Sequence, residues 1–223
     1  MVKTSPCVSC DKCCFGKMCK DYLFDNCVTL FTQSLQRKKE LEKGQYLYHP
    51  GDTITHLMAL RTGTVKIYDP AGNIVNVKTP GQVIGTEDLY TQTYHYQAVA
   101  ATDIQLCLLE RSRIYDLSQI TENFINYVTD MLSFEIAEQQ KMISVLVSPD
   151  ALAKVRGYLR LIAQRYEWYG FSAHNIPLPM TFKEMATLLG VSISSLNRAL
   201  TELKESEEIA MDKKNIQIKN LSV

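Results

Sequence analysis

The sequence has no long hydrophobic run and no apolar leader. No stretch approaches the roughly 18 apolar residues that a membrane-spanning helix needs. Residues 1–10 also lack the hydrophobic core of a signal peptide. We therefore expect a cytoplasmic protein with no membrane partner, in a compartment that keeps thiols reduced.

An excess of charge of either sign is also missing. The 223 residues carry 24 lysines and arginines and 24 aspartates and glutamates, so the formal net charge is zero. This balance argues against a protein that coats nucleic acid or an acidic membrane through bulk charge, and any contact with nucleic acid must come from a local surface. The length leaves room for two compact units.

Histidine is scarce, and a catalytic motif is missing. The sequence holds only four histidines, and no combination of serine, histidine and acid forms a recognisable motif. Each histidine is more simply explained as a surface or core residue than as a ligand, so we expect no enzyme. The four are His49, His56, His95 and His174.

Cysteine, by contrast, is concentrated at one end. Five of the seven cysteines lie within the first 19 residues: Cys7, Cys10, Cys13, Cys14 and Cys19. Cys10, Cys13 and Cys19 have the spacing C-x2-C-x5-C. Cys7, Cys10 and Cys13 have the spacing C-x2-C-x2-C, which opens a bacterial ferredoxin ligand set. Both spacings indicate a binding site for an iron-sulfur cluster. A four-iron cluster needs four thiolates, so a short loop that provides three needs a fourth from elsewhere in the fold.

The fourth ligand and the nature of the site stay open at this point. Cys27 precedes an apolar run and fits a small buried residue, whereas Cys107 lies in a strand-like stretch, 104–109, that would hold a ligand still. Cys7 or Cys14 could replace a ligand. A structural zinc site also takes four thiolates, although it usually shows two short cysteine pairs. Clustered thiols can also exchange disulfides and act as a redox switch.

The centre of the chain changes its hydrophobic period. Residues 22–39 predict one or two short helices that end in a solvated charged run, 36–40. From Leu41 to Leu109 the period is two, and glycine turns recur about every ten residues. Residues 65–68 and 74–78 flank a hairpin turn. These signals predict an antiparallel barrel or jelly roll.

A narrow apolar stripe begins near Phe124. Its members step by three or four residues, which is typical of a coiled-coil seam. Gln139 fits a two-stranded seam, where it can bond its symmetry mate. The same stripe would suit a helix lying on its own barrel, so periodicity leaves both interpretations open. The stripe comprises Val128, Leu132, Ile136, Gln139, Ile143 and Leu146.

The last third predicts a helix-turn-helix. Residues 181–184 form a capping box, Gly190 suits a left-handed turn, and Ser192 can cap a second helix that reaches Leu203. A hairpin wing follows at 209–218. A small helical domain without DNA is the alternative, but the outward face of the second helix is short and hydrogen-bonding. The candidate DNA contacts are Ser194, Ser195, Asn197, Arg198 and Lys213.

The order of these parts resembles the catabolite-activator and FNR superfamily of bacterial transcription regulators. Residues 44–52 and 61–65 resemble its cyclic-nucleotide-binding-type jelly roll, and 188–192 followed by Arg198 resemble its recognition motif. The resemblance implies a homodimer that binds a palindromic operator in double-stranded DNA, with RNA polymerase as a further partner. It also implies an α+β fold of four parts: a cysteine arm at 1–21, a jelly-roll sensor domain at 22–120, a long dimerisation helix at 121–147 and a winged helix-turn-helix at 148–223.

The cysteines resemble the FNR branch alone. Cys10, Cys13, Cys19 and Cys107 fall where FNR proteins carry the ligands of an oxygen-labile [4Fe-4S] cluster. This implies an oxygen-responsive transcription regulator. The alternatives are a disulfide-sensing regulator of the same fold and, in another class, an iron-sulfur electron carrier, for which a helix-turn-helix would have no use.

Three departures from the family pattern limit what the resemblance implies. The stretch 85–98 lacks the arginine that pairs with a nucleotide phosphate, and Asp88 adds a negative charge, so we expect no cAMP. Ser194 stands where the FNR pattern has glutamate, so the usual half-site does not carry over. Gln139 stands where an acid would make dimerisation depend on charge.

Overall fold

A computed structural model describes residues 37–112, 122–169, 171–173, 175–178, 180–212 and 215–219. The cysteine arm lies outside these ranges, as do Lys213 and residues 22–36 of the helical stretch expected over 22–39. The chain divides into two compact units, Met1–Phe134 and Glu135–Val223.

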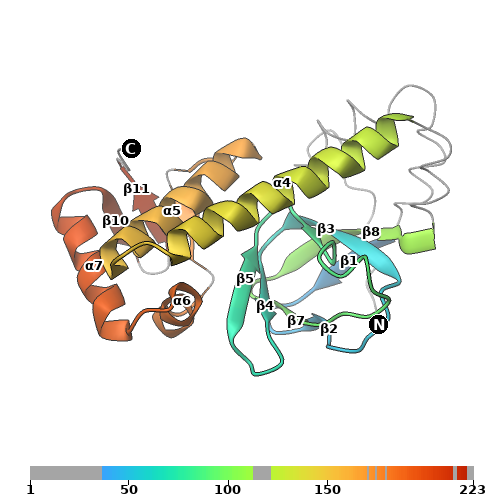
Figure 1. Ribbon diagram of the computed structural model, residues 1–223, viewed down its shortest axis with the longest axis horizontal. Helices are drawn as coiled ribbons and strands as arrows, with labels where there is room; N and C mark the ends of the chain where they lie inside the picture. The colour runs from blue at the N-terminus through green and yellow to red at the C-terminus, as the bar shows by residue number, and fades with distance from the viewer. Residues whose placement is uncertain are drawn as a thin grey trace. The chain divides into compact units, whose positions relative to one another are not determined.

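The first unit holds a β-roll made of two four-stranded antiparallel sheets (Figure 1). One sheet has the strand order β1-β8-β3-β6 and the other has the order β2-β7-β4-β5. The predicted α+β class and jelly roll are confirmed. The strands are β1 (Arg37–Leu41), β2 (Tyr46–Tyr48), β3 (His56–Thr62), β4 (Val65–Tyr68), β5 (Ile74–Lys78), β6 (Val83–Ile84), β7 (Gln97–Ala100) and β8 (Ile104–Glu110).

Alternating side chains fill the roll. In β4, Val65 and Ile67 are buried while the residues that follow each of them are half-buried, as a period of two requires. The strands β4 and β5 form the predicted hairpin. Its turn is held by Asp69, whose carboxylate accepts from the backbone N–H of Asn73 at 2.7 Å.

The charged segment before Leu41 is a strand and not the end of a helix. β1 pairs antiparallel with β8 from Arg37 to Leu41 and lies at the edge of its sheet. Charged side chains suit an edge strand because they oppose the addition of further strands. The helical prediction is therefore wrong over 37–39, and the roll begins at Arg37.

The helix α4 (Glu122–Leu146) is the predicted long helix, with 25 residues. In its first half Met131 is buried, and Val128 and Leu132 pack with it against Leu57 and Val83 of the roll. This part of the stripe therefore lies on the helix's own barrel. Within the described ranges, no helix is both long enough and apolar enough to cross a bilayer.

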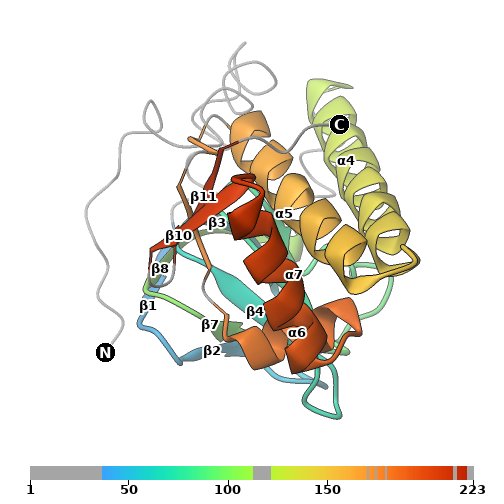
Figure 2. The same cartoon turned by 90° about the vertical axis from the view of Figure 1, so that its left-hand side faces the viewer.

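The described part of the second unit contains three further helices and a small sheet (Figure 2). The helix α7 packs against both α5 and α6. Asp150 caps α5, accepting from the N–H of Ala153 at 2.7 Å. The predicted wing strands are present, but a third strand, β9, escaped prediction because two residues carry no period. The elements are α5 (Ala151–Trp168), β9 (Ile176–Pro177), α6 (Phe182–Leu189), α7 (Ile193–Glu205), β10 (Ile209–Asp212) and β11 (Asn215–Ile218).

Candidate nucleic-acid interface and sensor site

The turn between α6 and α7 is built as the sequence predicts. Thr181 accepts from the N–H of Glu184 at 3.2 Å, and the Glu184 carboxylate accepts from the N–H of Thr181 at 2.7 Å. Gly190 ends α6 with φ 61°, a left-handed conformation that glycine adopts without strain. Ser192 then caps α7, accepting from the N–H of Ser195 at 3.0 Å. Two capped helices are thus held at a fixed turn.

The first turns of α7 present a group of linked hydroxyls. The Ser192 hydroxyl lies 2.9 Å from the hydroxyls of both Ser194 and Ser195. Arg198 donates from Nη2 to the Ser195 hydroxyl at 3.3 Å. Ser194, Asn197 and Arg198 are exposed, and Ser195 is half-buried. The structure therefore brings four of the five candidate DNA residues onto one helix, while Lys213 lies outside the described residues.

The inner face of α7 anchors this group. Leu196, Leu200 and Leu203 are buried, as the sequence predicts. Ile193, expected on the same face, is 47% exposed. It is the first residue of α7, at the end of the buried face. The buried side chains leave the polar face outward.

The wing is tied to α5 by an ion pair. Arg156 donates from Nε and Nη2 to the two carboxylate oxygens of Glu208 at 2.7 and 2.8 Å. These hydrogen bonds hold the pKa of the Glu208 carboxyl below its ordinary value and raise the pKa of Arg156. The pair fixes the chain at the point where α7 gives way to β10. The sequence offered no signal for it, since the partners lie 52 positions apart.

Cys107 lies on the outer face of the roll. Its neighbours in β8, Leu106 and Leu108, belong to the roll's interior, so alternation places Cys107 on the opposite face of the sheet. It stands directly opposite Ala59 in β3. A half-buried thiol on a central strand can meet thiolates from another segment without opening the core, which fits the chemistry of a cluster ligand. Cys10, Cys13 and Cys19 lie outside the described residues.

The stretch 85–98 corresponds to the segment that binds the phosphate in cyclic-nucleotide-binding proteins. Here its acidic side chains contact other groups of the protein. The ammonium group of the buried Lys78 lies 4.0 Å from the Glu87 carboxylate. Asp88, also buried, accepts from the backbone N–H of His95 at 3.1 Å and lies 2.7 Å from its ring Nδ1. Both carboxylates therefore face protein groups. The sequence analysis does not single out Lys78 and treats His95 only as a surface or core residue, because residue types alone do not show which partners these side chains meet.

Two stacked tyrosines lie in the core of the same roll. The ring centroids of Tyr48 and Tyr94 are 3.6 Å apart. Burial raises the pKa of Tyr94 to about 12 and raises the pKa of Tyr48 further still. The Tyr94 hydroxyl donates to the carbonyl of His56 at 3.3 Å. These neutral phenols offer no positive charge to a nucleotide phosphate.

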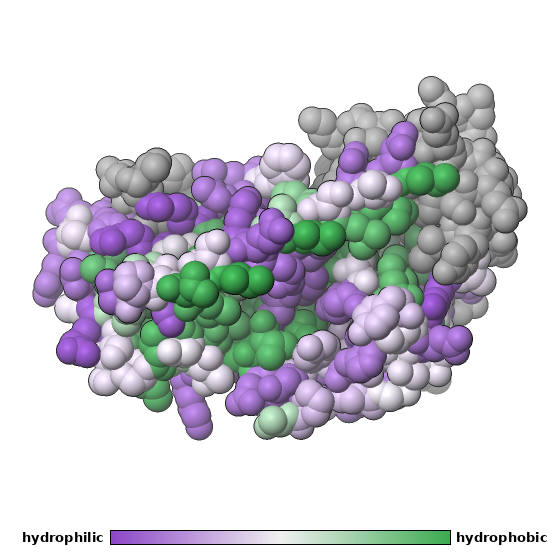
Figure 3. Space-filling model, viewed as in Figure 1, coloured by the Kyte–Doolittle hydropathy of each residue, from purple (hydrophilic) through white to green (hydrophobic). Residues whose placement is uncertain are grey.

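The second half of the apolar stripe on α4 is open. Ile136 and Ile143 are 60% and 59% exposed, and Gln139 between them is exposed as well. Figure 3 shows hydrophobic side chains gathered along α4. The stripe therefore divides: Val128 and Leu132 cover the roll, and the later positions remain available to a partner helix.

Two known domain families match separate parts of the chain. The cyclic nucleotide-binding domain family matches residues 38–120, and the Crp-like helix-turn-helix domain family matches residues 153–223. The regulatory protein HlyX of Actinobacillus pleuropneumoniae is 26% identical over 219 residues, covering 96% of this chain and 91% of the relative.

Two further matches agree with this result. The fumarate nitrate reduction regulatory protein of Klebsiella oxytoca is 26% identical over 218 residues, covering 96% of this chain and 87% of the relative. The structure of FixK2 from Bradyrhizobium japonicum has the same fold, with a TM-score of 0.72 at 20% identity, covering 83% of this chain and 93% of that one.

Proposed function

The chain belongs to the CRP/FNR family of DNA-binding transcription regulators, which are not enzymes, and on that premise we propose that it is an oxygen-responsive member that senses through a [4Fe-4S] cluster. It acts in the cytoplasm as a homodimer on a palindromic operator and contacts RNA polymerase there. Several relatives are themselves named as anaerobic regulators, which supports this branch. The cluster ligands are Cys10, Cys13, Cys19 and Cys107.

The position of Cys107 carries the sensing part of the proposal. Its neighbour across the strands, Ala59, belongs to the apolar cluster formed by Leu57, Val83 and Met131. Met131 is a residue of α4, so a restraint on Cys107 acts on the sheet face against which that helix packs. When bound, an oxygen-labile cluster would link the thiolates of the cysteine arm to Cys107 on β8. Release of Cys107 would remove that restraint from the sheet face and would shift the population of α4 between packed arrangements.

DNA reading rests on α7. The exposed side chains of Asn197 and Arg198 follow a capped helix start, the part of a recognition helix that meets base edges in the major groove. The guanidinium of Arg198 can pair with O6 and N7 of guanine. Lys78 and Asp88 already have partners inside the roll, and this supports a regulator that needs no cyclic nucleotide.

Anaerobic reconstitution with iron and sulfide tests the proposal. Mössbauer spectra should show about one [4Fe-4S] cluster per chain that is lost in air, and operator affinity should fall with it. Serine replacements of Cys10, Cys13, Cys19 and Cys107 should each abolish the visible absorption, whereas Cys27→Ser is the matched control that retains it.

Each contrary result has a distinct meaning. Retention of the cluster in Cys107→Ser would make Cys7 or Cys14 the fourth ligand. Four thiolates holding zinc, or an air-formed disulfide without iron, would overturn the cluster while leaving the DNA-binding function in place. Tight binding of cAMP, measured by calorimetry, would overturn the proposal that the roll binds no cyclic nucleotide.

A further inference from the structure

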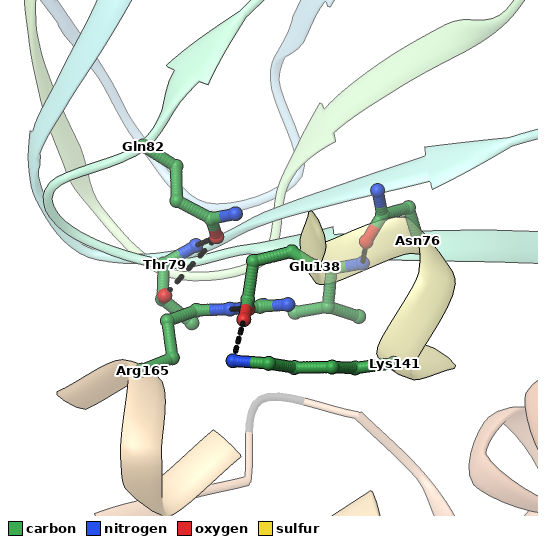
Figure 4. A network of polar contacts seen from close by, with 7 residues as sticks. Asn76, Thr79, Gln82, Glu138, Lys141 and Arg165 are labelled. Carbon is green, nitrogen blue, oxygen red and sulfur yellow. Dashed lines mark hydrogen bonds and ion pairs between the residues drawn. The ribbon is translucent and has the colours of Figure 1, made fainter. Parts of the chain in front are cut away.

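A buried ion pair joins the last half of α4 to α5 within the second unit. Glu138 of α4 and Arg165 of α5 have side chains that are 4% and 9% exposed, and Arg165 Nε donates to Glu138 Oε2 at 2.8 Å. The other carboxylate oxygen of Glu138 accepts from the exposed Lys141 at 3.4 Å. Figure 4 shows Glu138 reaching from α4 toward both cations. Breaking this hydrogen bond is costly, because both side chains are largely shielded from the water that would replace the lost partner.

A second contact lies further along the same two helices. A Cβ atom at Gly157 of α5 would lie 3.1 Å from Cγ2 of Val145 in α4. The absence of a side chain at Gly157 thus lets the helix axes approach closely, as small residues do at helix contacts. Two separate contacts, one ionic and one steric, hold the last half of α4 against α5.

The opposite side of this half-helix is the exposed stripe. At about 100° per residue, Glu138 and Val145 lie roughly half a turn around the helix from Ile136 and Ile143. One side is therefore fixed to α5, and the other side is open to a partner. Since α7 packs on α5, the chain of contacts runs from the stripe to the recognition helix within one unit.

We propose that Glu138 and Arg165 form a positioning pair that sets the angle between the dimer stripe and the recognition helix, and thereby the half-site spacing that the dimer accepts. The inference rests on the proposed function, since it needs a dimer with two reading heads. Half-sites of such dimers must match the distance between the two recognition helices. On this proposal, the last half of α4 moves together with the DNA-binding helices as one rigid body when the protein adjusts to an operator.

The test separates position from stability. The double variant Glu138→Leu with Arg165→Met removes both charges together, a change that buried pairs often tolerate without loss of stability. Operators are first selected from random DNA with the wild type, and affinities are then measured for the selected spacing, for spacings one base pair longer and shorter, and for a single half-site. Wild type should prefer the selected spacing by about tenfold or more.

The expected result is loss of spacing preference with the reading head intact. The double variant should bind the three spacings within about threefold of one another, while its affinity for a single half-site and its denaturation midpoint stay near wild type. Glu138→Gln, which keeps the shape of the side chain, should give an intermediate preference and serves if the double variant does not fold. Lys141→Ala is the matched control, because it removes the exposed cation from the same carboxylate and should keep the full preference.

A folded double variant that retains the wild-type spacing preference would overturn the positioning role, as would a wild type indifferent to spacing. Failure of the wild type to bind even a single half-site would instead overturn the proposed DNA-binding function. Glu208→Gln breaks the ion pair with Arg156 in the same unit and checks for general loosening. If it removes spacing preference to the same extent, the effect does not belong to Glu138 and Arg165.

Discussion

The proposed reading face of α7 departs from the FNR-type pattern at Ser194. Ser194 replaces the glutamate of the FNR-type motif, and its hydroxyl lies 2.9 Å from the Ser192 hydroxyl. A hydroxyl can rotate to donate or to accept a hydrogen bond, so the Ser194 hydroxyl discriminates poorly between bases. A carboxylate would accept from a cytosine amine and reject other bases. Discrimination should therefore shift to Arg198.

We predict that Arg198→Ala loses specificity at a guanine, at a cost of about 1 to 3 kcal/mol. Ser194→Glu should sharpen the preference for cytosine at the adjacent base. Sites selected from random DNA under anaerobic conditions provide the measurement.

A control for the reading face comes from the wing. Lys213→Ala should weaken all sequences alike and lower the salt slope by about one unit. If Arg198→Ala leaves both the selected motif and the affinity unchanged, α7 is not the reading helix.

At the scale of elements, local signals were predictable and contacts between elements were not. The capping box at Thr181 and the turn at Gly190 depend on neighbours in sequence, and both were found where expected. The edge strand β1 was mistaken for a helix because its charged residues show no alternation, and only pairing with β8 defines it. The pairs of Glu138 with Arg165 and of Arg156 with Glu208 join residues far apart in sequence, so no spacing reveals them.

The attachment of the wing to α5 should depend on pH. Glu208 has a folded-state pKa below its ordinary value of 4.5, chiefly because Arg156 donates to it. A lowered pKa contributes stability that is present above the unfolded value and is lost as pH falls through the folded value. We predict that Glu208→Gln lowers the free energy of unfolding by about 1 to 2 kcal/mol near pH 7.

The difference between wild type and Glu208→Gln should shrink as pH falls below 4.5. Urea denaturation at a series of pH values measures it. Glu207→Gln, at the exposed neighbouring residue, is the matched control and should stay near wild type throughout. A difference that grows in acid would contradict the direction of the pKa shift.

For the whole molecule, the divided stripe on α4 assigns two tasks to one helix. Val128 and Leu132 pack against the roll in the same apolar cluster as Ala59, which stands opposite Cys107. Ile136 and Ile143 remain exposed. Periodicity could not distinguish the two tasks, since both use the same spacing of apolar residues. In the proposed dimer, a signal at the roll would alter α4 without first separating the partners, because the residues proposed for the dimer contact differ from those that pack on the roll.

We predict that the dimer survives loss of the cluster. Gln139 lies between Ile136 and Ile143 on the exposed part of the stripe and is neutral, so this position adds no like-charge repulsion to the proposed seam. Gln139→Glu would place two carboxylates against each other, and the dimer should become about tenfold weaker or more at neutral pH. Acid should restore it, because repulsion raises the carboxyl pKa and protonation removes the charge.

Sedimentation velocity over a range of concentrations, before and after exposure to air, measures this. Wild type should remain a dimer in both states while its operator affinity falls in air, which would place the switch in the geometry of the dimer. Ser144→Glu is the matched control, since it adds the same charge to an exposed position away from the stripe and should not weaken the dimer. If air-exposed wild type sediments only as a monomer, the switch acts through association, and the neutral seam at Gln139 does not protect the dimer.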